Sequence, residues 1–400
     1  MALDRIVVVG ASLAGFRAAE ELRAQGHAGA LTVVGGEVHA PYDRPPLSKQ
    51  VLAGTWDAER TRLERPDQLL DVEWRLGTEA SGLDLGGRAV VLGGGERVPF
   101  DGLVVATGAR PRQLPGVEHL AGIHTLRTLD DCRDVAAAVA GGARRVVVVG
   151  AGFIGAEVAA TCRTLGLEVT LVEALAVPLE RVLGARLGGF VADLHRGHGV
   201  DVRLGVGVVA VEGGERVERV RLTDGTVLDA DLCVVGIGVV PNTEWLDGSG
   251  LELADGVVCD ATCRAAPGVV AAGDVARWPN RRFGEVMRVE HWDNAAEMGA
   301  HAARTLLAGE GGGEPYEPIP WFWSDQYDRK IQLAGRAAPG DEVEVVEGSL
   351  EEQRFTALFG RGDRLVGVLG VNMPARVVRW RARIAEGTSW SAALAEAAAP

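Results

Sequence analysis

The sequence predicts an α/β protein that contains two dinucleotide-binding units. Residues 5–15 and 145–155 each place a run of β-branched residues before a glycine-rich turn, and a helical pattern follows the turn. This order is typical of a βαβ unit, in which the helix N-terminus offers free N–H groups and a positive dipole end to a pyrophosphate. Two such units in one chain predict two bound dinucleotides.

The composition is that of a globular protein and limits the classes of partner. The chain has 400 residues, 47% hydrophobic and 24% charged, which is enough for two or three domains. A formal net charge of −14 argues against nucleic acid as a partner, because phosphate binding needs a basic surface. No segment approaches the roughly 20 apolar residues of a membrane helix, and the apolar run after Arg5 is too short for a signal peptide. We therefore expect a cytoplasmic protein with no membrane partner.

The cysteines form no recognisable redox or metal motif. The closest pair is separated by a spacing that is typical of neither redox dithiols nor zinc sites. We expect reduced, buried thiols and no metal site. The five cysteines are Cys132, Cys162, Cys233, Cys259 and Cys263.

The first glycine-rich turn departs from the usual fingerprint at one position. Gly10 permits the tight turn and Gly15 permits close packing of helix and strand, but Ser12 replaces the second glycine. A second strand follows at residues 31–34, and Glu37 lies where an acid can hydrogen-bond a ribose. Taken alone, this copy would leave an ordinary glycine turn in an α/β protein as an alternative.

The second glycine-rich turn removes most of that ambiguity. Gly150, Gly152 and Gly155 supply all three glycines, and a helix is expected over residues 157–165. The next strand ends at Glu173, 23 residues after Gly150, which is close to the expected spacing of the ribose-binding acid. This spacing predicts that the second unit also binds a dinucleotide.

Six further segments carry a resemblance to a known family. Their sequences are APYDRPPLSK (40–49), ATGARP (106–111), GIGVVPN (236–242), AAGDVA (271–276), EHWDNA (290–295) and WFWSDQ (321–326). In this order, and over the chain to about residue 375, they closely resemble the FAD-dependent, NADH-using ferredoxin reductases of bacterial oxygenase systems.

The resemblance implies a fold like that of glutathione reductase, with a C-terminal α+β domain. An FAD-binding domain would comprise residues 1–114 and 242–318, interrupted by an NAD-binding domain at 115–241, and the last domain would comprise residues 319–400. The segments at 106–108 and 236–238 would mark the crossovers between the first two domains, and glycines 311–313 look like a linker.

The resemblance also implies the residues of the site. Glu157 would lie near the nicotinamide and pair with Lys49 beside the reactive flavin nitrogen, and Trp323 would pack by the flavin ring. An ordinary acid in the first turn of a helix and a core tryptophan are the alternatives. Asp274 would bind the ribityl chain, and a cap on a following helix is an alternative that could hold simultaneously. Arg44 and Lys49 would line the flavin and its pyrophosphate, with a solvated loop as the alternative. The FAD set is Gly10, Ser12, Ala14, Gly15, Glu37, Arg44, Lys49, Ala106, Thr107, Gly108, Asp274, Trp292 and Trp323, and the NAD set is Gly150, Gly152, Phe153, Ile154, Gly155, Glu157, Glu173 and Gly238.

The function implied is electron transfer from NADH through FAD to a [2Fe–2S] ferredoxin that serves a cytochrome P450 or a Rieske dioxygenase. A disulfide reductase is disfavoured, because no CxxC follows the first glycine turn. A redox-sensing flavoprotein resembling apoptosis-inducing factor stays open. We expect an acidic ferredoxin to dock transiently on a basic patch formed by Arg281, Arg282, Arg288, Arg329 and Lys330. The sequence leaves open which ferredoxin and oxygenase are served, the oligomeric state and the effect of Ser12 on FAD binding.

Overall fold

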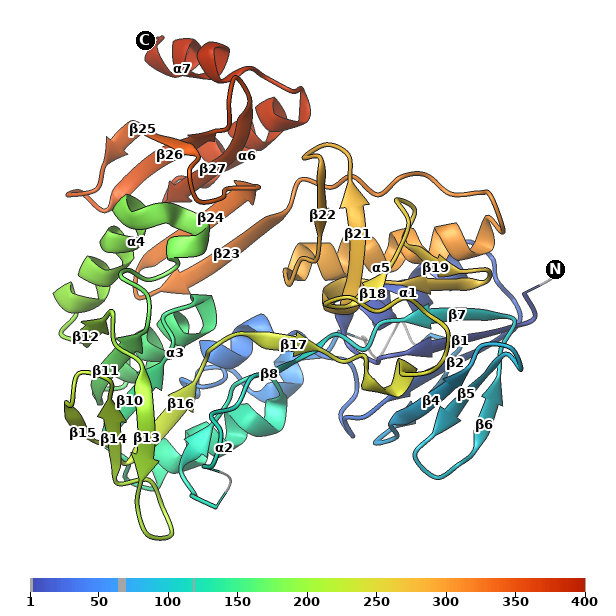
Figure 1. Cartoon of the computed structure of the whole chain (residues 1–400), viewed down its shortest axis with the longest axis horizontal. Helices are drawn as coiled ribbons and strands as arrows, with labels where there is room; N and C mark the ends of the chain where they lie inside the picture. Colours follow the sequence, from blue (N-terminus) through green and yellow to red (C-terminus); the bar gives the residue numbers. More distant parts are fainter. Residues whose placement is uncertain (1–2, 64–69, 118, 400) are drawn as a thin grey trace. The chain divides into compact units, whose positions relative to one another are not determined.

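The computed structural model describes residues 3–63, 70–117 and 119–399. It divides into two compact units, which are described separately below (Figure 1). Unit 1 comprises Met1–Asp43, Glu59–Arg110 and Val240–Pro320, and unit 2 comprises Arg44–Ala58, Pro111–Val239 and Trp321–Pro400. Strands β8 (Ala109–Pro111) and β17 (Val239–Pro241) carry the chain across the boundaries between them.

Unit 1 is built on a six-stranded sheet with the order β19-β20-β7-β1-β2-β3. All its pairs are parallel except β19 with β20, as expected when βαβ crossovers supply the connections. The bounds are β1 (Arg5–Val9), β2 (Ala30–Gly35), β3 (Glu73–Leu76), β7 (Gly102–Val105), β19 (Arg264–Ala266) and β20 (Val269–Ala271).

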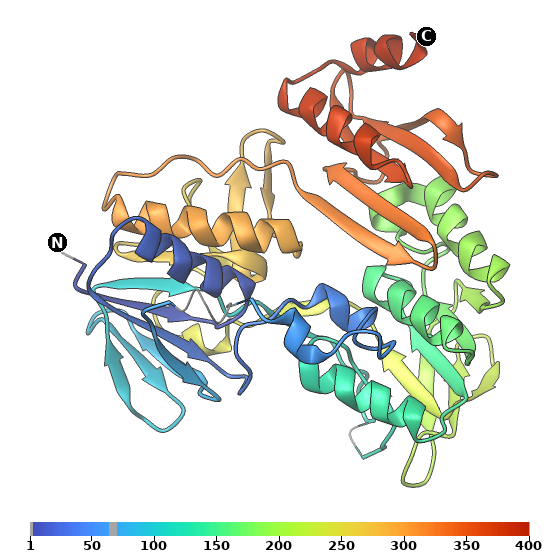
Figure 2. The same ribbon diagram turned by 180° about the vertical axis from the view of Figure 1, so that it is seen from behind.

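Two helices, α1 (Leu13–Ala24) and α5 (Trp292–Leu307), lie side by side on one face of this sheet (Figure 2). They approach closely because α5 has a glycine at the crossing: a Cβ on Gly299 would lie 2.3 Å from the carbonyl oxygen of Ala14. The rest of unit 1 comprises two small sheets, β4 (Ala80–Asp84) with β5 (Ala89–Leu92) and β6 (Arg97–Pro99), and β18 (Val257–Val258) with β21 (Ala276–Asn280) and β22 (Glu285–Met287). Short 3₁₀ turns η2 (Ala58–Thr61), η3 (Glu244–Leu246) and η4 (Gly273–Val275) complete it, the first starting at the unit boundary.

Unit 2 contains a five-stranded parallel sheet with the order β12-β11-β10-β16-β9. Alternate residues of β10 face opposite sides. Val147 and Val149 pack with the small antiparallel sheet β13–β15, whereas Val148 faces α3, where a Cβ on Gly155 would lie 3.5 Å from its side chain. The bounds are β9 (Ile123–His124), β10 (Arg145–Val149), β11 (Glu168–Glu173), β12 (Asp201–Leu204), β13 (Val208–Glu212), β14 (Arg219–Leu222), β15 (Val227–Asp229), β16 (Leu232–Val235), α2 (Leu129–Ala140), α3 (Phe153–Thr164), α4 (Glu180–Gly197) and the 3₁₀ turn η1 (Pro45–Ser48).

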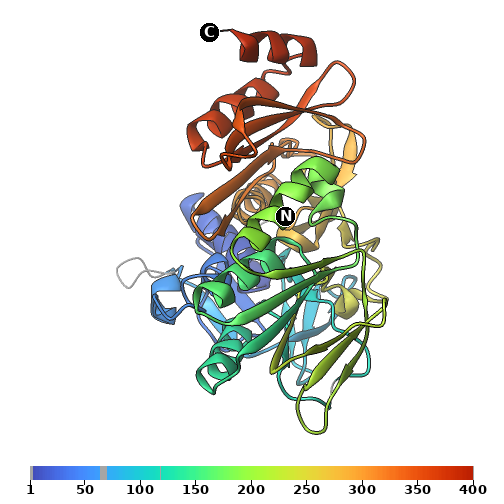
Figure 3. The same cartoon turned by 90° about the vertical axis from the view of Figure 1, so that its left-hand side faces the viewer.

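The C-terminal part of unit 2 is an antiparallel sheet with the order β23-β24-β27-β26-β25, followed by two helices. Helix α4 packs against this sheet (Figure 3), and Leu187 and Leu194 of α4 share one core with Phe322 and Phe355. The bounds are β23 (Trp321–Gln326), β24 (Arg329–Gly335), β25 (Glu342–Ser349), β26 (Arg354–Gly360), β27 (Leu365–Val371), α6 (Pro374–Ala385) and α7 (Trp390–Ala398).

The predicted fold class is confirmed, with one correction at the second turn. Helix α3 begins at Phe153 rather than at residue 157, because Gly152 takes the extended N-cap conformation and the helix starts directly after it. Among the described residues, no helix is both long and apolar enough to cross a membrane.

Candidate active site

The first glycine turn is shaped by two close backbone contacts. Gly10 has φ +117°, and a Cβ there would lie 2.0 Å from the carbonyl oxygen of Ala106. A Cβ on Gly15 would lie 1.8 Å from the carbonyl oxygen of Gly10, so α1 can reach β1 only without a side chain at that position. Ser12 is the N-cap of α1, with φ −91° and ψ −167°, an extended conformation open to any residue. The protein itself therefore requires two of the three fingerprint glycines.

The second turn repeats this geometry in unit 2. Gly150 has φ +96°, and its Cβ would lie 2.3 Å from the carbonyl oxygen of Gly236, while a Cβ on Gly155 would lie 2.0 Å from the carbonyl oxygen of Gly150. Gly152 differs, because its φ is −69° and the nearest described atom to a Cβ there would lie 4.0 Å away. The open space beside Gly152 is therefore a cradle that a side chain would partly fill, at the N-terminus of α3 where a phosphate is favoured.

Three other positions of the predicted NAD set belong to α3 and to the loop after β16. Ile154 is 46% exposed although it is apolar, and Gly238 has φ +94° in the loop after β16. Phe153 packs edge-on against Phe322, with ring centroids 4.2 Å apart. An exposed apolar side chain beside a glycine turn suits contact with a bound cofactor.

The two predicted ribose acids lie at the ends of equivalent strands. Glu173 ends β11, and its two carboxylate oxygens accept hydrogen bonds from the backbone N–H groups of Ala151 (2.8 Å) and Leu175 (2.9 Å). Glu37 follows β2 and accepts a hydrogen bond from the Tyr42 hydroxyl. A carboxylate has about four acceptor positions, so Glu173, which uses two of them here, retains capacity for ribose hydroxyls.

The remaining predicted FAD residues of unit 1 lie on connections around its sheet. Asp274 is buried in η4, and the segment that follows is strand β21 rather than a helix, so the N-cap alternative is wrong. Thr107 exchanges two hydrogen bonds with Asn242, through its hydroxyl (2.8 Å) and its carbonyl (2.9 Å). The next residue, Gly108, has φ +66°.

Trp292 is the first residue of α5 and donates its indole N–H to Asp43 at 2.8 Å. Burial raises the pKa of Asp43, which makes that carboxyl a weaker acid than usual.

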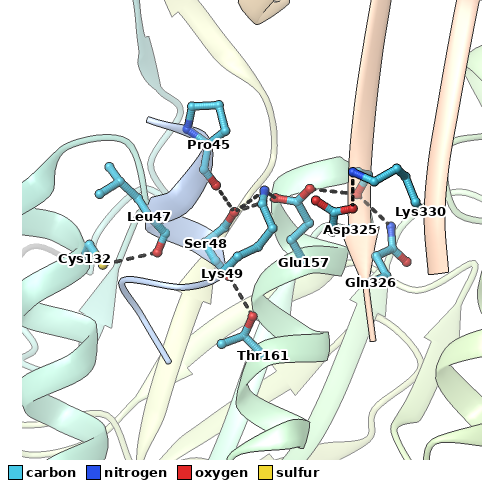
Figure 4. A network of polar contacts seen from close by, with 11 residues as sticks. Pro45, Leu47, Ser48, Lys49, Cys132, Glu157, Thr161, Asp325, Gln326 and Lys330 are labelled. Carbon is cyan, nitrogen blue, oxygen red and sulfur yellow. Dashed lines mark hydrogen bonds and ion pairs between the residues drawn. The ribbon is translucent and has the colours of Figure 1, made fainter. Parts of the chain in front are cut away.

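Glu157 accepts hydrogen bonds from three side chains in the interior of unit 2 (Figure 4). Its Oε2 atom lies 2.6 Å from Lys49 Nζ and 2.5 Å from Ser48 Oγ, and its Oε1 atom lies 2.8 Å from Ser324 Oγ. Only 3% of Glu157 and 11% of the Lys49 side chain are exposed. A buried carboxylate that accepts from three donors, one of them an ammonium group, is held in one rotamer.

The position of Glu157 excludes one of its two interpretations. It is the fifth residue of α3 and is buried, so it is not an exposed first-turn acid that complements the helix dipole. Lys49 uses one ammonium proton toward Glu157 and another toward Ser48 (3.2 Å), and the third proton is available for a bound group.

The Pro-Pro-Leu-Ser-Lys segment is fixed to two helices. The Thr161 hydroxyl, one turn after Glu157 in α3, donates to the Ser48 carbonyl at 2.8 Å, and the Cys132 thiol of α2 donates to the Leu47 carbonyl at 3.2 Å. Arg44 donates to the carbonyl of Arg127 at 2.5 Å. The segment is thus an ordered support for Lys49, and the solvated-loop alternative is wrong.

The two tryptophans of β23 stack on one face of that strand, with ring centroids 5.3 Å apart. Trp321 and Trp323 are both partly exposed, whereas Phe322, Ser324 and Gln326 on the opposite face are buried. Trp323 is therefore not an ordinary core tryptophan, and its neighbour Ser324 ties the strand to Glu157.

Comparison with known proteins identifies the family. Residues 4–299 match the pyridine nucleotide-disulphide oxidoreductases, and residues 321–400 match the reductase C-terminal family. The chain belongs to the pyridine nucleotide-disulphide oxidoreductases. It is 39% identical to rhodocoxin reductase of Rhodococcus erythropolis, over 92% of this chain and 86% of that protein.

Other relatives lie in the same group of reductases. The chain is 36% identical to the ferredoxin–NAD(+) reductase component of the anthranilate 1,2-dioxygenase system of Burkholderia cepacia, over 97% of this chain and 95% of that protein. The reductase in the crystal structure of a covalent putidaredoxin reductase–putidaredoxin complex superposes with a TM-score of 0.91 at 35% identity, over 97% of this chain and 94% of that one. The resemblance stated from the sequence motifs is confirmed.

Some residues of this oxidoreductase site were not predicted. Ser48 and Ser324 adjoin the predicted Lys49 and Trp323, so their motif positions were a signal that could have found them. Their common partner could not be predicted from spacing, because it lies 109 and 167 residues away.

The basic patch expected to dock a ferredoxin needs one correction. Arg288 has a side chain only 12% exposed, and it pairs with Asp255 and Glu290 and donates to the Asp274 carbonyl. It supports η4 and is not a surface charge. Arg281 is exposed and Arg282 is half-buried, so these two remain candidates for docking in unit 1.

Proposed function

We propose that this chain takes a hydride from NADH onto FAD and passes the electrons singly to a [2Fe–2S] ferredoxin. FAD, when bound, accepts two electrons as hydride and can release them one at a time. The observation that carries the proposal is the buried ion pair between Lys49 and Glu157, in which Glu157 belongs to α3, the helix that follows the second glycine turn. The relatives named above suggest that the ferredoxin serves a cytochrome P450 or a Rieske dioxygenase.

In this proposal each of the two glycine turns binds one cofactor. The turn at residues 10–15 would hold FAD in a domain of residues 1–114 and 242–318, and the turn at 150–155 would hold NADH in a domain of residues 115–241, with residues 319–400 as the C-terminal domain. The residues present fit both groups, since each turn presents a helix N-terminus and each following strand presents an acid.

The polar residues of unit 2 would prepare the reacting region without themselves exchanging protons. Glu157 neutralises Lys49 and fixes the direction of its ammonium group, which leaves one N–H of Lys49 to bind a flavin atom. Trp323 would pack against the flavin ring from β23. We include Arg44, Asp274 and Trp292 in the FAD site, each held by a neighbouring element as described above.

Thiol chemistry has no support in this chain. All five cysteines are free and buried. Burial raises the pKa of Cys132 to about 11 and that of Cys162 to about 12, so both stay protonated and unreactive at neutral pH. We include a cytoplasmic location in the proposal, since free thiols suit a reducing compartment.

The test is NADH-driven reduction of each [2Fe–2S] ferredoxin encoded by the same genome, followed anaerobically by stopped flow. We expect rapid flavin reduction by NADH and then catalytic reduction of at least one ferredoxin. Lys49→Met and Glu157→Gln should slow the first step, while the matched buried-polar variant Thr356→Val should not. A long-lived complex of reduced flavin and NAD(+) that reduces no ferredoxin would instead support the redox-sensing alternative.

A further inference from the structure

The polar contacts of Glu157 continue beyond Ser324 into a chain of buried hydrogen bonds. Gln326 Nε2 lies 3.1 Å from Ser324 Oγ, and Gln326 Oε1 lies 3.1 Å from His195 Nε2. His195 Nδ1 lies 2.9 Å from the Tyr327 hydroxyl. Ser324, Gln326 and His195 are completely buried, and all residues of this hydrogen-bond chain belong to unit 2. Figure 4 shows the end of this chain nearest Glu157.

The Glu157 carboxylate fixes the direction of every bond. As the acidic partner of the ion pair with Lys49 it only accepts, so Ser324 must donate its only hydroxyl proton to Oε1. Ser324 Oγ can then only accept, so the amide of Gln326 must present its N–H₂ to Ser324 and its oxygen to His195. His195 must in turn carry its proton on Nε2, and its Nδ1 accepts from Tyr327. All donors point toward Glu157.

The surroundings make a neutral His195 with one fixed tautomer. Burial lowers the pKa of His195 to about 4, against a smaller raising effect of its hydrogen bond with Gln326, and the neighbouring His198 lowers it further. The other charged or titratable groups around this end are Tyr327, which stacks on the His198 ring, and Arg163 of α3, which donates to the His198 carbonyl. No carboxylate in the described parts of the chain is bonded to either nitrogen of His195, so a positive charge there has no direct partner.

These buried hydrogen bonds occupy a place where apolar packing was possible. They lie beside the apolar core shared by α4 and the C-terminal sheet, where apolar side chains of similar size would avoid the burial of polar atoms. Tyr327 occupies the hairpin turn between β23 and β24 with φ +56°, a left-handed conformation that is unusual for an aromatic residue. The two-residue turn itself requires this conformation, and it places the Tyr327 hydroxyl 2.9 Å from His195 Nδ1.

We propose that His195, acting through Gln326 and Ser324, is a positioning residue that holds the Glu157 carboxylate in one orientation, so that the tautomer of His195 is coupled to the hydrogen-bonding state of Glu157. This inference rests on the proposed role of Glu157. The chain transmits orientation and does not conduct protons, because the amide of Gln326 neither gains nor loses a proton in the accessible pH range.

This coupling predicts that Glu157→Gln changes the tautomer of His195. Ser48 and Lys49 both donate toward the former Oε2 position, so the new amide must place its oxygen there and its N–H₂ toward Ser324. Ser324 is then free to donate to Gln326, the Gln326 amide turns over, and His195 must accept at Nε2. The proton of His195 therefore moves to Nδ1.

The experiment is ¹⁵N NMR of the holoprotein labelled on histidine, because protonated and unprotonated ring nitrogens have well-separated shifts. The chain has eight histidines, and loss of one signal set in His195→Gln assigns His195. We expect the Nε2–H tautomer in the wild type and the Nδ1–H tautomer in Glu157→Gln. The matched control Gln332→Met removes a buried glutamine from the adjacent strand and should keep the Nε2–H tautomer.

Two further variants keep the inference open to refutation if Glu157→Gln folds poorly. Ser324→Ala cuts the chain, and it should slow reduction of the flavin by NADH roughly tenfold with little change in the Kd for NAD(+). Ser324→Thr restores the hydroxyl and should recover most of the rate. The same tautomer in wild type and Glu157→Gln, or an unchanged rate in Ser324→Ala, would overturn the inference. An unchanged rate of flavin reduction in Glu157→Gln with a switched tautomer would instead overturn the proposed role of Glu157.

Discussion

Gly152 and Gly155 belong to the same turn but are expected to respond differently to substitution. In Gly155→Ala the new methyl group would lie 2.0 Å from the Gly150 carbonyl oxygen, whereas ordinary contact begins near 3.4 Å. Both atoms are held by backbone, so α3 must move away from β10 by more than 1 Å. Overpacking of this kind costs about 1–3 kcal/mol, and the higher helix propensity of alanine returns at most about 1 kcal/mol.

The matched variant is Gly152→Ser, which copies the residue found at Ser12. The two positions have the same extended N-cap conformation, and the nearest described atom to a Cβ at 152 would lie 4.0 Å away. We expect thermal unfolding of the holoprotein to show Tm lowered by roughly 2–8 °C in Gly155→Ala and unchanged within about 1 °C in Gly152→Ser. Titration with NAD(+) should show weaker binding in Gly152→Ser despite its normal stability. Equal Tm values for Gly155→Ala and the wild type would refute the close-packing argument.

Three other perturbations test separate parts of the molecule. NADH should be preferred to NADPH by roughly 30- to 1000-fold in kcat/KM, because in the proposed site Glu173 would accept from ribose hydroxyls and repel a 2′-phosphate. Equal kcat/KM values in the wild type would contradict the proposed role of Glu173. The folded-state pKa of His195, about 4, lies below the usual 6.5, so the unfolded chain binds more protons than the folded chain between these two values. The free energy of unfolding should therefore fall by up to about 3 kcal/mol as the pH drops from 6.5 to 4. Denaturant unfolding should show a smaller loss over this range in His195→Gln, and an identical loss would count against a depressed pKa. Arg281→Glu with Arg282→Glu should raise KM for an acidic ferredoxin most strongly at low salt and spare ferricyanide reduction, whereas an unchanged salt dependence would place docking elsewhere.

The features that could be predicted from the sequence are those with a local physical cause. Gly10 and Gly150 must adopt positive φ beside a crossing chain, and the strand–glycine–helix order makes that requirement visible in one short segment. The pairing of Lys49 with Glu157 came from the family resemblance, since 108 residues separate them and no periodicity connects them.

The features that were missed depend on contacts between distant segments. His195 gave no signal in the sequence, because a single histidine on a helix has no motif and its partners lie more than 130 residues away in β23 and the following turn. Arg288 was misplaced for the same reason: its neighbours in the sequence suggest a basic cluster, but the fold brings Asp255 to it and buries it.

Helix α3 links the proposed cofactor site to the positioning of Lys49, because Gly155, Glu157 and Thr161 all belong to this one helix. Its N-terminus at Gly152 is open for a phosphate, and Gly155 allows the helix to contact β10. Glu157 and Thr161 are separated by four residues and therefore lie on one face, where they hold the side chain of Lys49 and the backbone of Ser48. Any shift of α3 at the glycine contact must therefore also move the Glu157 carboxylate relative to Ser324. Substitution of Gly155 should thus impair NADH oxidation more than the loss of stability alone would explain.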